Sequence, residues 1–267
     1  MRAALGDSFN AAIDAALTEA LTLIAGAMSG AAAADRQPAW WDATVVTSAR
    51  VSRDIAVTQL QLDEPLPYQP GQYVSVQVPQ CPRRWRYFSP AMPPDPDGCI
   101  EFHVRAVHRL SVSTAIVGDT EPGDRWRLSS PHGGMHVDRD GGDVLMVAGS
   151  TGLAPLRALI MDLMRFAEKP RVHLFFGARH PCELYDLPTL WQIAACSPWL
   201  SVTPVSEFPG DPWWADDYPD PEPPRGLHVR EIGRLPDVVS RYGAWSDRQI
   251  LISGRPEMVT ATRAALI

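Results

Sequence analysis

The sequence predicts two domains, an antiparallel β-barrel over residues 39–140 and an α/β domain with a parallel sheet over residues 141–267. Two observations lead to this fold class. Short β-rich runs separated by proline and glycine fill the first region, whereas strand and helix patterns alternate in the second. The chain has 267 residues, of which 45% are hydrophobic, and this is enough for two ordinary domains with real cores.

Residues 1–38 are predicted to form an amphipathic helix followed by a linker. Apolar residues recur there every three or four positions, which places them on one helical face. Asp7, Asp14 and Glu19 interrupt the apolar run that a signal peptide or a membrane span requires, so we expect a soluble segment. The apolar face comprises Phe9, Ile13, Leu17, Leu21, Ile24 and Met28.

The first domain is predicted from five β-rich runs. Turn residues such as the Pro70-Gly71 pair separate them, which is typical of an antiparallel barrel or sandwich. One short helix is expected at residues 113–117. The five runs are ATVVTSARV, IAVTQLQL, QYVSVQV, WRYFS and CIEFHVRAV.

The second domain is predicted from the alternation that begins at Asp143. The apolar strand VLMVAG is followed by the helical PLRALIMDLMRF and by a second apolar strand, VHLFFGAR. Further strands are expected at LSVTPVS and QILIS, with helices between and after them. Such alternation implies a parallel sheet with helices on both faces. The proline-rich, acidic FPGDPWWADDYPDPEPPRG predicts a surface loop.

Charge and cysteine usage exclude several classes of partner. The net charge is −7 and the pI is near 5.5, whereas nucleic acid or an anionic membrane would require a basic surface. We therefore expect neither as a partner. The four cysteines are scattered without a C-x2-C pair, so no metal site is predicted. Reduced thiols are typical of a cytoplasmic protein.

The segment AGSTGLAPLRALI, residues 148–160, joins an apolar strand to a helix. Gly149 and Gly152 leave the turn without side chains, and Pro155 suits a first helical turn. At the carboxyl end of a parallel strand, such a turn lets a pyrophosphate approach backbone N–H groups at the helix N-terminus. Two interpretations stay open: a nucleotide site, or glycines that merely allow a tight turn.

Three segments in this order resemble the ferredoxin–NADP reductase superfamily: RYFSP at 86–90, the glycine turn, and ISGRPEM at 252–258. The chain is most similar to the reductase part of flavohaemoglobins, from about Trp41 onward. The resemblance implies FAD on the barrel and a nicotinamide nucleotide on the α/β domain. It also suggests that residues 1–38 are a remnant of a globin domain, and that the C-terminus is truncated, because another strand follows the family's last helix.

The resemblance implies a flavin site in the first domain. In the family, the arginine of an Arg-x-Tyr-Ser strand pairs with phosphate, the aromatic ring lies against the isoalloxazine, and the hydroxyl bonds to the ring edge. The matching positions here are Arg86, Phe88 and Ser89, with Tyr87 between them, and Leu110 stands where the family has a glycine. The strand FHVRAV and the turn LSVST add His103, Val104, Arg105, Ser111, Val112 and Ser113.

The resemblance also implies a nucleotide site in the second domain. Ser253 replaces a cysteine beside the hydride path, and Ser89 and Ser253 are the predicted catalytic residues. Glu207 stands where NADPH users carry an arginine. A carboxylate about 4 Å from a 2′-phosphate costs about 1 kcal/mol in water, so NADH is predicted. The implied nucleotide-side residues are Gly149, Ser150, Thr151, Gly152, Pro155, Arg179, Glu207, Ser253 and Gly254.

The sequence therefore predicts an NADH-dependent flavoprotein reductase that takes a hydride onto FAD and passes electrons to a haem or globin partner or to an oxygenase. The departures at Phe88, Leu110 and Ser253 leave an alternative open, a catalytically impaired flavin- or nucleotide-binding module without efficient hydride transfer. A dehydrogenase of small alcohols fits less well, because it would leave the β-rich first half without a role. Hydride transfer between two cofactors needs no general base, so no histidine is assigned a catalytic role.

Overall fold

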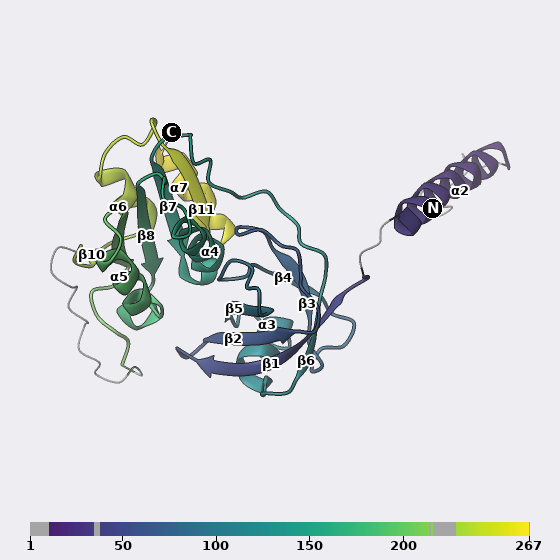
Figure 1. The fold of residues 1–267 in the computed structure, drawn as a ribbon, viewed down its shortest axis with the longest axis horizontal. Coiled ribbons are helices and arrows are strands. Elements are labelled where there is room, and N and C mark those ends of the chain that lie inside the picture. The colour runs from purple at the N-terminus through teal and green to yellow at the C-terminus, as the bar shows by residue number, and fades with distance from the viewer. Residues whose placement is uncertain (1–10, 35–37, 214, 216–227, 267) are drawn as a thin grey trace. The chain divides into compact units, whose positions relative to one another are not determined.

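The computed structural model describes residues 11–34, 38–213, 215 and 228–266. The chain divides into two compact units, residues 1–39 and residues 40–267, and each is described by itself. Figure 1 shows the elements of both units. Most of the expected surface loop at residues 208–226, and the apolar Phe9, lie outside the described residues.

The first unit contains one helix, α2 (Ala11–Ala34), in its described part. Four of its large apolar side chains, Leu21, Leu23, Ile24 and Met28, are exposed within this unit, and Met28 is 67% exposed. By length and composition the stretch Ala12–Gly30, with a mean hydropathy of 1.3, could cross a membrane, but the core helix of a soluble protein passes the same test. The predicted helix is therefore confirmed.

The first half of the second unit is a six-stranded antiparallel sheet with the strand order β4-β3-β6-β1-β2-β5. After β4, Pro90 bridges Phe102 of β5, so the two edges of the sheet approach each other and the sheet almost closes into a barrel. The elements are β1 (Trp41–Arg50), β2 (Ile55–Leu62), β3 (Val74–Gln77), β4 (Arg86–Phe88), β5 (Cys99–Arg105), β6 (Arg125–Leu128) and the helix α3 (Val112–Asp119).

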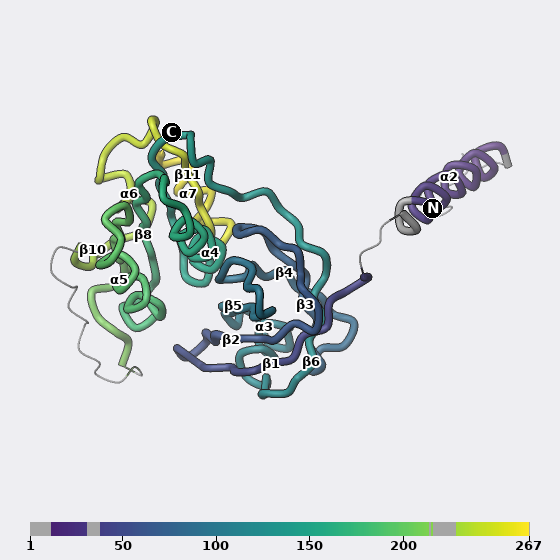
Figure 2. The backbone as a smooth tube through the Cα atoms, viewed as in Figure 1, coloured from purple at the N-terminus to yellow at the C-terminus, as the bar shows by residue number. Residues whose placement is uncertain are grey.

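The second half of this unit is a five-stranded parallel sheet with the order β10-β9-β8-β7-β11. Its strands are β7 (Val144–Gly149), β8 (Val172–Ala178), β9 (Leu200–Ser206), β10 (Glu231–Ile232) and β11 (Gln249–Ser253). Its helices are α4 (Leu153–Leu163), α5 (Leu187–Ala195), α6 (Leu235–Arg241) and α7 (Pro256–Leu266), with short 3₁₀ turns η2 (Ser150–Gly152) and η3 (Pro181–Glu183). The backbone can be followed from strand to helix in Figure 2.

Alternate residues of the parallel strands pack into two separate apolar cores. Leu174 and Phe176 of β8 join the core beneath α4 and α5, whereas Phe175 joins the core beneath α6. Helices therefore cover both faces of the sheet, as the apolar strand runs predicted. The predicted fold class is confirmed in both halves of residues 40–267.

Three elements differ from the sequence expectation. The short helix expected at 113–117 extends over Val112–Asp119, because Ser111 caps its N-terminus by accepting a hydrogen bond from the Thr114 N–H. Strands β6 and β10 were not expected. The alternating RWRL of β6 was not recognised as a β-rich run, and the two residues of β10 are too few to show a strand periodicity.

His173, near the start of β8, lies in an aromatic cluster. Its ring stacks on Phe175 with 4.3 Å between centroids and on His228 with 5.5 Å, and its Nε2 lies 2.9 Å from Thr203 Oγ1. Burial, and after it the charges of His228 and Arg248, lower the pKa of His173 to about 4. The folded protein therefore binds this proton more weakly than the unfolded chain does.

We expect acid to destabilise the protein through His173. The unfolded chain takes up the proton below its ordinary pKa of about 6.5, so the free energy of unfolding falls as the pH drops from there towards about 4. Between about pH 7 and about pH 5 the loss is about 2 kcal/mol at most. Urea unfolding at both pH values measures it. His173→Gln should reduce this difference, and the exposed His136→Gln should not; an unchanged difference in His173→Gln would contradict the assignment.

Candidate functional site

Two turns of the parallel sheet meet at the carboxyl ends of neighbouring strands. β7 ends at Gly149 and continues into η2, while the adjacent β11 ends at Ser253, which pairs in register with Ala148. A Cβ at Gly152 would overlap the carbonyl group of Ser253. The glycine at position 152 thus allows one turn to pack backbone against backbone on the other. Close packing against the turn after β11 therefore explains the glycine at position 152, and neither interpretation in the sequence analysis named this contact.

A cleft of about 790 Å³ separates these turns from strands β4 and β5 of the barrel. It unites most of the residues that the sequence analysis named. Those lining it are Arg86, Tyr87, Phe88, Ser89, His103, Arg105, Ser113, Gly149, Ser150, Thr151, Gly152, Pro155, Ser253 and Gly254. Segments far apart in the chain, near residues 86–89 and 149–152, therefore face one space.

Five named residues lie elsewhere. The side chain of Val104 is part of the barrel core, and Val112 is buried in the same core. Ser111 caps α3. Arg179 and Glu207 line a second, smaller pocket beside the cleft.

The aromatic residues of β4 differ in exposure. Tyr87 is 66% exposed, and its ring meets Tyr73 edge-on at 5.1 Å. Phe88 is partly buried and packs on the barrel core. Because side chains alternate along a strand, these neighbouring rings lie on opposite faces of β4. The more exposed aromatic surface in the cleft thus belongs to Tyr87.

The turn before α3 contains a backbone conformation that favours glycine, although the residue there is a leucine. Leu110 has φ +57°, in the left-handed region that costs most residues about 1–2 kcal/mol, and its side chain is 86% exposed. Its carbonyl accepts a hydrogen bond of 2.9 Å from Arg84. Nearby, Ser113 Oγ accepts from the Val107 N–H at 3.4 Å. The leucine therefore leaves the path of the turn intact.

Arg105, at the end of β5, connects the two halves of the unit. Its Nε lies 2.7 Å from Asp54, while its two terminal nitrogens donate to Ser150 Oγ and Glu183 Oε1, each at 3.0 Å. Burial alone would lower the pKa of Arg105, but the carboxylates of Glu183 and Asp54 raise it, so the side chain stays cationic. Arg105 borders both the cleft and the smaller pocket.

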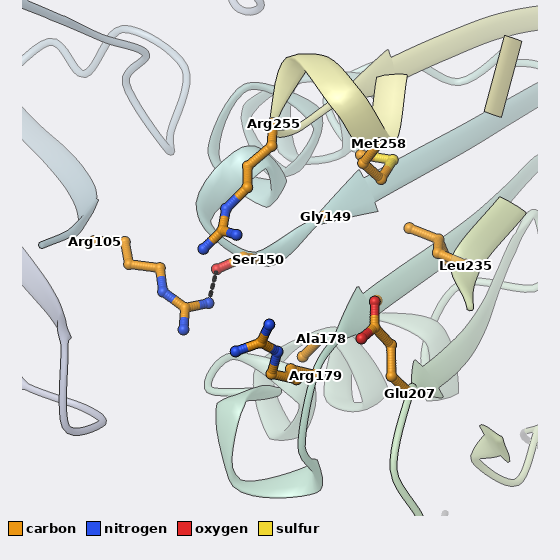
Figure 3. A pocket seen from close by; sticks show the side chains of 10 residues that line it. Arg105, Gly149, Ser150, Ala178, Arg179, Glu207, Leu235, Arg255 and Met258 are labelled. Carbon is orange, nitrogen blue, oxygen red and sulfur yellow. Dashed lines mark hydrogen bonds between the residues drawn. The ribbon is translucent and has the colours of Figure 1, made fainter. Parts of the chain in front are cut away.

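The smaller pocket, of about 140 Å³, lies at the carboxyl ends of β7, β8 and β9. Figure 3 shows the guanidinium groups of Arg105, Arg179 and Arg255 around Ser150, with the carboxylate of Glu207 on the other side. This arrangement suits an elongated anion whose charged part lies among the arginines and whose hydroxyls meet a carboxylate acceptor.

Sequence reasoning did not assign several residues that line these pockets. Arg255 directly follows Gly254, so its position beside the turn was a usable signal. Met258, the last residue of the quoted ISGRPEM segment, lines the smaller pocket from α7. Leu235 lines it from α6, and no local pattern marks Leu235. Within the described residues, no three His, Cys, Asp or Glu side chains gather as a metal ion would require.

Comparisons with known proteins were made for both sequence and fold. Residues 42–137 match the family model of the oxidoreductase FAD-binding domain. The reductase component of phenol 2-monooxygenase from Pseudomonas sp. (strain CF600) is 36% identical over 166 residues, which cover 61% of this chain and 47% of that protein. The reductase subunit of an aromatic O-demethylase from Amycolatopsis sp. is 33% identical over 182 residues, covering 66% and 54%. This chain spans about half the length of these curated relatives.

Two solved structures illustrate the likeness of fold. An Amycolatopsis cytochrome P450 reductase superposes with a TM-score of 0.71 at 29% identity, covering 85% of this chain and 65% of that one. A flavohaemoglobin from Malassezia yamatoensis, with bound FAD and haem, gives a TM-score of 0.74 at 18% identity, covering 99% and 67%. At that identity the second likeness concerns the fold alone.

We expect Gly152→Ala to destabilise the protein, because its Cβ would force apart the two turns that now touch. Overpacking of this kind costs about 1–3 kcal/mol. The free energy of unfolding in urea measures the effect. Gly134→Ala is the matched control, since its Cβ would have nothing within 4 Å. Equal stability of the two variants would mean that the turns do not depend on a bare backbone at residue 152.

Proposed function

We propose that this chain, a member of the ferredoxin reductase superfamily with an oxidoreductase FAD-binding domain at residues 42–137, is a flavoprotein reductase that oxidises NADH and passes electrons to an oxygenase or haem protein. One observation carries the proposal. The cleft places the residues expected to hold flavin on β4 and β5 opposite the two turns expected to hold nicotinamide. Two cofactors held there could react directly.

The barrel side of the cleft fits a flavin. Arg86 offers a cation for the diphosphate, and the exposed ring of Tyr87 offers a stacking surface, with the partly buried Phe88 beside it in the lining of the cleft. Ser89 offers a hydroxyl at the end of the strand for the polar edge of the ring system. The N-terminus of α3 faces the same part of the cleft through Ser113 and favours negative charge.

The opposite side fits a dinucleotide. The open N-terminal end of α4 and the cations of Arg105, Arg179 and Arg255 suit its diphosphate. Glu207 can accept hydrogen bonds from ribose hydroxyls, whereas a 2′-phosphate would meet its carboxylate. This arrangement supports NADH as the hydride donor.

When bound, FAD accepts a hydride, which is two electrons and a proton, and gives the electrons up one at a time. The role of the chain's own residues is to hold the two cofactors in position. The turns at residues 149–152 and 253–254 would support nicotinamide, and Ser89 and Ser253 both line the cleft in which the two cofactors would meet. No described side chain needs to exchange a proton for the hydride step itself.

The relatives suggest the class of electron acceptor. Those compared above are reductase components of a phenol monooxygenase and an aromatic O-demethylase, and one structural neighbour is a cytochrome P450 reductase. We infer an oxygenase component or a haem protein as the acceptor here. The four cysteines are free, which suits a reducing compartment such as the cytoplasm.

We expect the purified protein to bind added FAD with a flavin absorbance spectrum, and anaerobic NADH to bleach that spectrum. Ferricyanide should then be reduced on addition. A protein that binds FAD but is not bleached by NADH would be the impaired binding module that Leu110 and Ser253 leave open. A protein with no flavin spectrum would contradict the flavoprotein assignment.

We expect Glu207→Ser to relax the choice of nucleotide. Removing one carboxylate from beside the 2′-position removes about 1 kcal/mol of repulsion, so the ratio of kcat/KM for NADPH to that for NADH should rise about fivefold. Steady-state ferricyanide reduction with both nucleotides measures the ratio. Glu64→Ser, an exposed position on the barrel, is the control. If the ratio is the same in Glu207→Ser as in the wild type, the 2′-position of the bound nucleotide does not lie beside Glu207.

A further inference from the structure

Strand β5 carries apolar side chains on one face and polar side chains on the other. Ile100, Phe102 and Val104 point into the barrel core and are fully buried. The intervening Glu101 and His103 are also buried, although they are polar. Because strand residues alternate between faces, Glu101 and His103 share the other face with Arg105. Polar groups on that face need partners outside the barrel.

Each of these polar residues contacts the α/β half. Glu101 Oε1 accepts a hydrogen bond of 2.9 Å from Arg157 Nη1 of α4. His103 Nδ1 lies 2.8 Å from the hydroxyl of Tyr185, and Arg105 bonds to Glu183 as described above. The outward face of β5 is thus a row of polar contacts that joins the two halves.

The pair of Glu101 and Arg157 is the most constrained of these contacts. The two side chains are 9% and 12% exposed, and the same Arg157 Nη1 also donates to the Ala91 carbonyl at 2.7 Å. On the other side, Arg157 Nε lies 2.9 Å from Asp186 Oδ2, at ion-pair distance. Arg157 is therefore held by a carboxylate from each half and by the barrel backbone.

Glu101 is held equally firmly within the barrel. Its second oxygen accepts from Gln59 Nε2 at 2.8 Å, and His103 Nε2 lies 3.0 Å from its Oε1. Since a carboxylate only accepts, the proton of a neutral His103 lies on Nε2, and Nδ1 accepts from the Tyr185 hydroxyl. Burial favours the neutral carboxyl, but the hydrogen bonds from His103 and Gln59 and the charge of Arg157 lower the pKa of Glu101 to about 2. The carboxylate is thus ionised at every working pH.

The location of Arg157 connects this pair to the cleft. Arg157 lies on the second turn of α4, the helix that begins at Leu153 directly after the turn at Ser150–Gly152. His103 and Arg105, two and four residues after Glu101, line the cleft from the barrel side. A shift of α4 along β5 would therefore move one wall of the cleft relative to the other.

We infer that Glu101 and Arg157 are positioning residues for hydride transfer, because their ion pair sets the separation of the flavin and nicotinamide halves of the cleft. This inference rests on the proposed function. Neither residue was named by the sequence analysis, and neither lines the cleft. Their loss should slow the transfer step while leaving each cofactor's own contacts in place.

The test uses Glu101→Gln, which keeps the shape and removes the charge. Anaerobic stopped-flow bleaching of the FAD-loaded protein at saturating NADH gives the rate of hydride transfer, and titrations give the dissociation constants of FAD and NADH. We expect the rate to fall at least about tenfold, because a misplacement of about 1 Å can cost 100-fold, while both dissociation constants change less than about twofold. NADH deuterated at the transferred position should still react more slowly in the variant, which would assign the loss to the transfer step.

Asp63→Asn is the matched control, since it removes an exposed ion pair with Arg125 on the barrel and should leave the rate unchanged. If Glu101→Gln fails to fold, Arg157→Lys is measured in its place, because it retains the charge but not the fork that reaches Glu101 through Nη1 and Asp186 through Nε. An unchanged rate, or a loss of FAD binding equal to the loss of rate, would overturn the positioning role. A wild-type protein that binds FAD but is not bleached would instead overturn the proposed function.

Discussion

Strand β5 belongs to two packing arrangements at once, and the candidate site depends on this. One face supplies apolar side chains to the barrel core, and the other supplies Glu101, His103 and Arg105 to the α/β half. A register slip of one residue would bury the charged set in the barrel and expose the apolar set. The register of β5 therefore fixes the barrel and the wall of the cleft together.

The cleft floor depends on a second constraint, which acts on the backbone. β7 and β11 are neighbours in a parallel sheet, so both chains leave the sheet at the same edge. Their turns fit together because Gly152 has no side chain to hold them apart. The same turn lines the cleft at the N-terminal end of α4, where we propose that a phosphate binds. Packing against the neighbouring turn explains the glycine at position 152.

Local charge in the pockets differs from the charge of the whole chain. The protein carries −7 overall, yet Arg105, Arg179 and Arg255 surround the small pocket. Arg105 keeps its charge there because Asp54 and Glu183 balance it. Net charge describes solubility and broad classes of partner, whereas the side chains within a few ångströms decide which anion a pocket accepts.

The sequence by itself determined the order of strands and helices, both sheets, and the segments that border the cleft. Periodicity, turn residues and capping act over a few positions and can be counted along the chain. It did not determine β6, which no predicted run covers, β10, whose two residues show no periodicity, or the full length of α3. Only the tertiary structure decided that Arg105 reaches across to Ser150 and Glu183, and that Glu101 meets Arg157. Those partners lie 45, 78 and 56 residues apart, and such contacts depend on how two faces pack, which no local pattern encodes.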